Sequence, residues 1–148
     1  MHGSLVALAV RWLARRCSIV FYEFAAAAQE IPDAIGWRSN RSMLIECKTS
    51  RSDFQRDAKK LFRQYPEFGM GRHRYYLCPP GVIQVDDLPA RWGLLWAAHG
   101  RVRIKREAEE FVCDQTAEIK FLVSMLRRTQ VRLGSQPLST WLRWENMS

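Results

Sequence analysis

The sequence is poor in the residue patterns that build structural metal sites. It contains three histidines and four cysteines, and no two cysteines form a CxxC pair. Structural zinc needs ligand pairs at such short spacing, so the zinc-finger classes are excluded. The four cysteines stand among apolar neighbours instead, and we expect buried, reduced thiols at Cys17, Cys47, Cys78 and Cys113.

Long apolar runs are also missing. The N-terminal run Leu5–Val10 is too short to span a bilayer, and Arg11 ends it. No positively charged segment precedes it, as a secretion signal requires. We therefore expect a soluble, cytoplasmic protein that does not enter a membrane.

Acidic residues are scarce relative to basic ones. The chain of 148 residues has 15 Asp and Glu against 23 Lys and Arg, a net charge of +8. Such an excess favours polyanionic partners, nucleic acid above all. The length predicts one domain, which we place at residues 1–133, followed by a short tail at 134–148.

The order of the local patterns predicts an α/β fold with a mixed central sheet flanked by helices. An amphipathic helix over Leu5–Arg16 comes first. The strands expected after it are Ser18–Phe24, Ile31–Trp37, Met43–Lys48, Arg74–Cys78, Val82–Val85, Gly93–Ala98 and Arg101–Ile104. A second helix is expected from a capping box at Ser52 to about Tyr65, where Pro66 stops it, and a C-terminal helical extension is expected at about 107–129.

Three charged residues carry the candidate chemistry: Asp33, Glu46 and Lys48. Glu46 and Lys48 lie two apart on one strand, so their side chains share a face. If the hairpin loop spans Arg38–Arg41, residue 33 opposes residue 46, and their Cβ atoms lie about 5 Å apart. Two carboxylates that close repel each other unless a cation separates them, and hard oxygen ligands suit Mg²⁺ or Mn²⁺.

Lys48 has a different expected task. Its ammonium can hold an attacking water beside a metal that polarises a phosphoryl oxygen, which is sufficient for phosphodiester hydrolysis. The alternative is an ordinary solvated strand face, where an acid and a lysine two apart are common.

The segment Ile31-Pro32-Asp33, followed by Glu46-Cys47-Lys48, resembles the PD-(D/E)XK motif of the restriction-endonuclease-like nucleases. The stretch from Ser50 to Phe54, with Asp57 and then Lys59-Lys60, is similar to MmcB-type bacterial DNA repair nucleases. The similarity covers about residues 5–105 and implies an αβββαβ core. The C-terminal helix and tail carry no motif of that group.

The resemblance implies that Asp33 and Glu46 bind Mg²⁺ (or Mn²⁺), with the backbone carbonyl of Cys47 as a further ligand, and that Lys48 aids the nucleophile. Some members of the superfamily add an acid from the first helix, which this sequence lacks. The nearest substitute is Glu23, ahead of Gln29 and Glu30. The number of ions, one or two, stays open.

Several side chains are candidates for contact with a nucleic-acid backbone: Arg38, Arg41, Arg72, Arg74 and Gln64. A further basic stripe alternates over 101–106. Asp53 and Asp57 are expected in the first turn or so of the second helix, where acids stabilise the positive end of the dipole.

We expect a metal-dependent DNA nuclease that hydrolyses phosphodiester bonds within the strand of duplex or branched DNA, in repair, recombination or mobile-element processing. One alternative is a non-catalytic DNA-binding protein with a nuclease-like fold, and another is a structural subunit of a larger complex. A homodimer is a candidate assembly, and Trp141 and Trp144 are available to cover either its surface or the edge of the core.

Overall fold

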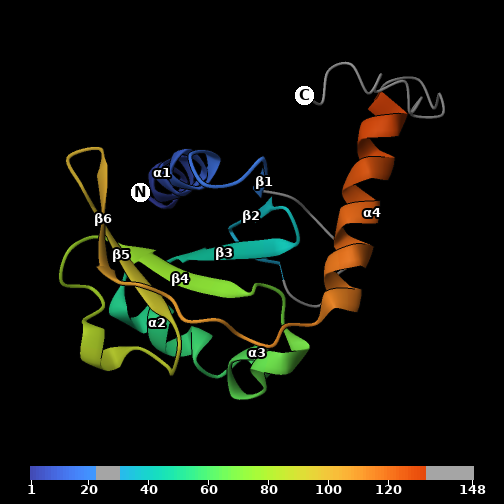
Figure 1. The fold of residues 1–148 in the computed structure, drawn as a ribbon. Helices are drawn as coiled ribbons and strands as arrows, with labels where there is room; N and C mark the ends of the chain where they lie inside the picture. Colours follow the sequence, from blue (N-terminus) through green and yellow to red (C-terminus); the bar gives the residue numbers. More distant parts are fainter. Residues whose placement is uncertain (23–30, 133–148) are drawn as a thin grey trace.

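Helices and strands alternate along the chain in the computed structural model, which describes residues 1–22 and 31–132 (Figure 1). The elements are α1 (His2–Ala14), β1 (Ile19–Tyr22), β2 (Ala34–Arg38), β3 (Arg41–Cys47), α2 (Arg51–Asp57), α3 (Leu61–Gln64), β4 (His73–Cys78), β5 (Gly93–Ala98), β6 (Arg101–Arg106) and α4 (Gln115–Arg132). Two short 3₁₀ turns are η1 (Pro66–Phe68) and η2 (Val85–Asp87).

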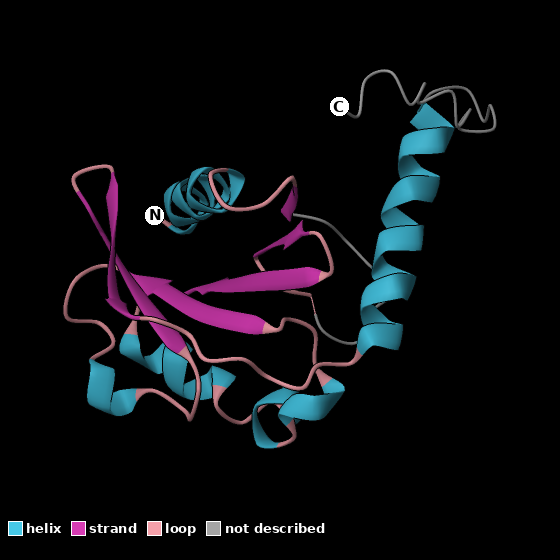
Figure 2. Cartoon of the chain, in the orientation of Figure 1, coloured by secondary structure: helices cyan, strands magenta, loops and turns pink. Residues whose placement is uncertain are grey.

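The described strands form one mixed sheet in the order β1-β2-β3-β4-β5-β6. The first three are antiparallel, β3, β4 and β5 run parallel, and β6 returns antiparallel to β5. In Figure 2, α1 lies on one side of the sheet, α2 and α3 lie on the other, and α4 stands at one end. The carboxyl ends of β3, β4 and β5 therefore meet at one edge.

Alternation along β3 divides the core into two layers. Ile45 and Cys47 belong to the apolar cluster under α1, whereas Leu44 belongs to the opposite cluster with Trp37 and Tyr76. Ile45 and Cys47 thus face one core layer, and the expectation of a buried thiol at Cys47 is confirmed. The opposite face is also buried over most of its length, because helices cover both sides of the parallel strands, so polar residues are confined to the strand end.

Three expected elements differ in the structure. The second helix is interrupted because Lys60 has extended backbone (φ −65°, ψ 143°), and Ser50 rather than Ser52 caps α2. Residues 82–84 form no strand, and η2 follows them. The C-terminal helix begins at Gln115 rather than near 107. Asp114 caps it, because the Asp114 side chain accepts a hydrogen bond from the Ala117 N–H (3.0 Å).

Residues 107–114 run as an extended strap instead of a helix. The Phe111 N–H donates to the Arg72 carbonyl (2.7 Å), and the Asp114 N–H donates to the Gly69 carbonyl (2.9 Å). These bonds to a distant loop replace the bonds within a helix, which the local sequence pattern alone did not indicate.

The four cysteines are free thiols, with Cys113 half-buried and the others buried. Within residues 1–22 and 31–132, no helix combines the length and apolar content that a membrane span requires.

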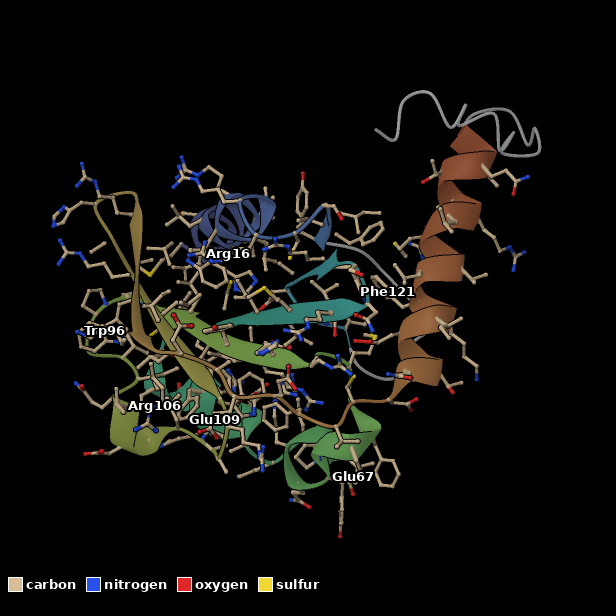
Figure 3. The ribbon with its side chains drawn as sticks, viewed as in Figure 1. Arg16, Glu67, Trp96, Arg106, Glu109 and Phe121 are labelled. Carbon is tan, nitrogen blue, oxygen red and sulfur yellow. The ribbon has the colours of Figure 1, made fainter. Side chains whose placement is uncertain are left out.

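The buried side chains of Phe121 and Met125 pack helix α4 against the sheet. The Phe121 ring is 2% exposed and stacks on Trp37, with 5.8 Å between ring centroids, while its edge meets Phe21 at 5.6 Å. Figure 3 shows Phe121 between α4 and the sheet. Leu126, on the same helix, is 48% exposed.

Replacing Phe121 with alanine is expected to lower the free energy of unfolding by about 3–5 kcal/mol, because it leaves a cavity under α4. The matched control, Leu126→Ala, should cost less than about 1 kcal/mol because Leu126 is half exposed. Urea unfolding followed by circular dichroism measures both. Equal losses would contradict this account of how α4 is anchored.

Candidate active site

The register of the β2–β3 hairpin brings Asp33 to the end of β3. Ala34 pairs with Ile45 and Arg38 with Arg41, so the turn consists of residues 39 and 40. The hairpin loop is thus shorter than expected, but the predicted register is confirmed. Asp33 lies one residue before β2, and its Oδ2 accepts a hydrogen bond from the Cys47 N–H (2.7 Å).

Glu46 and Lys48 lie beside this contact on the side of the sheet covered by α2. Both side chains are buried, and Lys48 Nζ lies 3.8 Å from Glu46 Oε2. The Lys48 N–H donates to the Leu77 carbonyl (2.9 Å), which fixes the residue at the carboxyl edge of the parallel strands. The three residues singled out in the sequence therefore converge.

A fourth residue, Asp57, organises the charges of this region. Its side chain is fully buried, and it accepts hydrogen bonds from Arg63 Nε (2.7 Å) and from the Tyr76 hydroxyl. Lys48 Nζ lies 3.3 Å and Lys60 Nζ 2.9 Å from its Oδ1. Tyr76 reaches it because β4 pairs Tyr76 with Glu46, which sets both on one face.

The expected role of Asp57 at a helix start is wrong. Asp57 is the last residue of α2, where a negative charge is opposed by the helix dipole and requires cations nearby. The interval of three residues between Asp57 and Lys60 was the available signal, because residues three apart near a helix end are neighbours. The contact of Arg63 with Asp57 depends on the break at Lys60, which the spacing does not show.

The two buried carboxyl groups have opposite pKa shifts. Burial raises the pKa of Glu46 to about 8; Arg63 and Lys48 counteract this rise, and Asp33 and Asp57 add to it. Burial also acts to raise the pKa of Asp57, but the charge and hydrogen bonds of Arg63 outweigh it and hold that pKa well below its usual range. Asp57 is therefore ionised at neutral pH, whereas the two cations beside Glu46 do not offset the effect of burial on its pKa.

The residues present fit a hydrated divalent cation. Among the described residues, no three His, Cys, Asp or Glu side chains are grouped to hold a metal, so protein ligation would rest on two carboxylates and a main-chain oxygen. Mg²⁺ retains several waters and is commonly bound through one or two carboxylates. The Asp33 side chain is 24% exposed and Glu46 is buried, and each has a nitrogen beside one oxygen: His2 Nε2 lies 3.2 Å from Asp33 Oδ1, and Arg63 Nη2 lies 3.2 Å from Glu46 Oε1. A bound cation would have to displace these two side chains.

Three expected phosphate contacts lie away from this site. Arg38 and Arg41 flank the hairpin tip, and β3 runs from Arg41 to Cys47, a distance of roughly 20 Å at 3.3 Å per residue. Arg72 precedes β4, whose first residue pairs with Met43 near the same far end. A hairpin tip necessarily lies opposite the carboxyl end of its second strand, so these arginines do not flank Asp33, Glu46 and Lys48.

The expectation that Arg74 contacts nucleic acid is wrong. Arg74 is fully buried because β4 pairs it with Leu44 and so directs it into the apolar layer. Its guanidinium donates to the carbonyls of Gly71 (2.8 Å) and Pro66 (2.7 Å) and lies over the Phe111 ring. Arg74 thus ties a loop and the strap to the sheet.

The remaining candidates have simpler outcomes. Gln64 is exposed at the end of α3. The possible extra ligands Glu23, Gln29 and Glu30, and the tryptophans Trp141 and Trp144, lie outside the described residues. The cations that do reach the site, Lys60 and Arg63, come from the segment after α2 and were not singled out as site residues.

Comparison with known proteins gives one structural relative and no function. No family model matches the chain, and no curated protein matches it. Among solved structures, SPO1766, a protein of unknown function from Silicibacter pomeroyi, is 26% identical with a TM-score of 0.66. The alignment covers 95% of this chain and 97% of that one, so the likeness extends over the whole α/β architecture.

Asp57→Asn is expected to lower the free energy of unfolding by about 3 kcal/mol or more at pH 7, because it leaves buried cations without a counter-charge. Since folding lowers the pKa of Asp57, its stabilisation is present above the ordinary value of 3.8 and is lost as pH falls further. The difference from wild type should therefore narrow below about pH 4.

Urea unfolding at a series of pH values measures this difference. Asp53→Asn is the matched control, because Asp53 is a partly exposed acid of the same helix whose pair with Arg56 should contribute less than about 1 kcal/mol. The ionised state of Asp57 would be contradicted if Asp57→Asn lowered the free energy of unfolding by the same amount at every pH. A loss no larger than that of Asp53→Asn would also contradict it.

Proposed function

We propose that this chain is a divalent-metal-dependent DNA nuclease with a restriction-endonuclease-like core, and that it hydrolyses phosphodiester bonds within the strand. The observation that carries the proposal is the hairpin register, which fixes Asp33 to the end of β3 beside Glu46 and Lys48. The order α1, β1, β2, β3, α2, β4 supports the fold assignment.

Asp33, Glu46 and the Cys47 carbonyl would hold Mg²⁺ or Mn²⁺. When bound, the ion supplies positive charge that polarises a phosphoryl oxygen and lowers the pKa of a coordinated water. Asp33 Oδ2 accepts the Cys47 N–H and Asp33 Oδ1 lies 3.2 Å from His2 Nε2, so the orientation of the carboxylate is set before any cation arrives and His2 would give way to the ion. That preorganisation favours the position over a solvated surface acid.

Lys48 would place positive charge beside the scissile phosphate and hold the attacking water by a hydrogen bond. The buried Asp57 carboxylate keeps the Lys48 ammonium next to Glu46, since its Oδ1 lies 3.3 Å from Lys48 Nζ. Arg63 and Tyr76 in turn fix Asp57 by hydrogen bonds. Asp57 is thus a positioning residue that acts through Lys48.

One observation favours a non-catalytic DNA-binding protein instead. Arg63 Nη2 lies 3.2 Å from Glu46 Oε1, so a guanidinium already stands where a metal would draw charge from Glu46. If that contact persists with Mg²⁺ present, the fold would bind DNA without cutting it. The cleavage experiment separates the two functions.

Wild-type protein should cut DNA in Mg²⁺ or Mn²⁺ and not in EDTA. Asp33→Asn and Lys48→Ala should each lower the rate by about a hundredfold or more, the loss typical of removing one group that stabilises transition-state charge. The assay uses linear, nicked, branched and single-stranded DNA, with binding measured in parallel.

The partly exposed Asp53 and the exposed Lys59 provide controls that keep the site intact. Asp53→Asn and Lys59→Ala change the same charges on α2 and just after it, and should retain wild-type rates. Lys48→Ala should still bind DNA, which separates loss of chemistry from loss of affinity. Equal cleavage by all five proteins, or none by wild type on any substrate, would contradict the proposal.

A further inference from the structure

A basic groove of about 570 Å³ lies along the β5–β6 hairpin. Its lining includes Trp96, His99, Arg101, Arg103 and Lys105 and contains no acidic residue. Figure 3 shows Trp96 on the flank of this hairpin, with basic side chains extending from the ribbon around it. The arginines and lysine are all exposed.

Strand pairing explains why these side chains share one surface. β6 sets Arg103 opposite Trp96 and Arg101 opposite Ala98, and alternate residues of a strand face the same way. Lys105, two residues further, has its Nζ 4.6 Å from the centroid of the Trp96 ring, so a cation–π contact orients its ammonium. The groove therefore presents a row of cationic side chains beside the Trp96 ring.

The positive charge of this row is not neutralised within the protein. Across the described residues, Arg101, Arg103 and Lys105 form no ion pair, whereas Arg51 pairs with Asp87 at 2.7 Å. Like charges close together on a strand face are destabilising unless an anion joins them. The alternative explanation is that the charges on this edge strand only prevent it from pairing with the sheet of another molecule. That role would not require the charges to line a groove.

The groove and the candidate active site lie on the same edge of the sheet. β3, β4 and β5 are parallel, so Lys48, which follows β3, and Ala98, which ends β5, mark the same carboxyl edge. Three strand spacings of about 4.8 Å separate β3 from β6, which carries the arginines and lysine of the groove, roughly 14 Å in total. That distance corresponds to about four steps of duplex DNA at 3.4 Å each.

We infer that this groove binds the phosphate backbone of nucleic acid without reading sequence. The arginine guanidinium groups offer forked donors that match phosphate oxygens, and the lysine adds a point charge. The inference does not require cleavage, because a backbone groove would bind nucleic acid equally in a protein that does not cut it. In a nuclease, it would hold the duplex beside Lys48.

The test compares two double variants that remove the same charge. Arg101→Gln/Arg103→Gln changes the groove, and Lys120→Gln/Arg127→Gln changes two exposed cations on α4. Fluorescence anisotropy with a short labelled duplex, in EDTA and over a salt series, measures the dissociation constant. The groove variant should bind at least about tenfold more weakly in 0.1 M salt, and its log–log salt slope should fall by about 1.8, or 0.9 per lost phosphate contact.

The α4 variant should change affinity by about twofold or less. Arg101→Lys/Arg103→Lys should keep most of the affinity, and circular dichroism melting checks that each variant folds. Equal losses from both double variants, or an unchanged salt slope, would overturn the inference. Aggregation of the groove variant in light scattering, without loss of affinity for the duplex, would also overturn the inference. The charges would then serve to keep the edge strand from pairing with another molecule. If the wild type cuts no DNA but the groove variant alone binds DNA more weakly, only the proposed nuclease function would be refuted.

Discussion

The pairing of β2 with β3 is the constraint on which the candidate site depends. Because side chains alternate between faces, a slip of one residue would turn Glu46 toward the layer under α1 and leave Asp33 without its neighbour. The Asp33–Cys47 hydrogen bond extends this register one residue beyond the hairpin ladder. Two carboxyl groups from separate strands thereby meet at the carboxyl edge of the sheet, where Lys48 also lies.

The charges around this pair form a buried network, and such a network is a poor way to stabilise a fold. Removing ions from water costs several kcal/mol each, and apolar residues of similar volume often serve as well. Here Asp57 engages Lys48, Lys60 and Arg63, and Glu46 also lies beside Lys48 and Arg63, although burial still raises its pKa. Because such a network adds little stability, its presence supports a functional reading over a structural one.

The sequence predicted the local features of the site better than its surroundings. Period-two alternation and a short polar turn were sufficient for β3 and for the register of Asp33 with Glu46. The position of Asp57 depends on where α2 ends, and the burial of Arg74 depends on its parallel pairing with Leu44, neither of which a local pattern contains. The arginines at the hairpin tip were placed near the site because sequence proximity does not show at which end of a strand a residue lies.

The central claim is that Asp33 and Glu46 together bind a divalent cation, and calorimetric titration with Mn²⁺ tests it most directly. Wild-type protein and the Asp53→Asn control should show saturable binding at this site, and Asp33→Asn and Glu46→Gln should each abolish it while remaining folded. No binding by the wild type, or the same binding in all four proteins, would contradict the account.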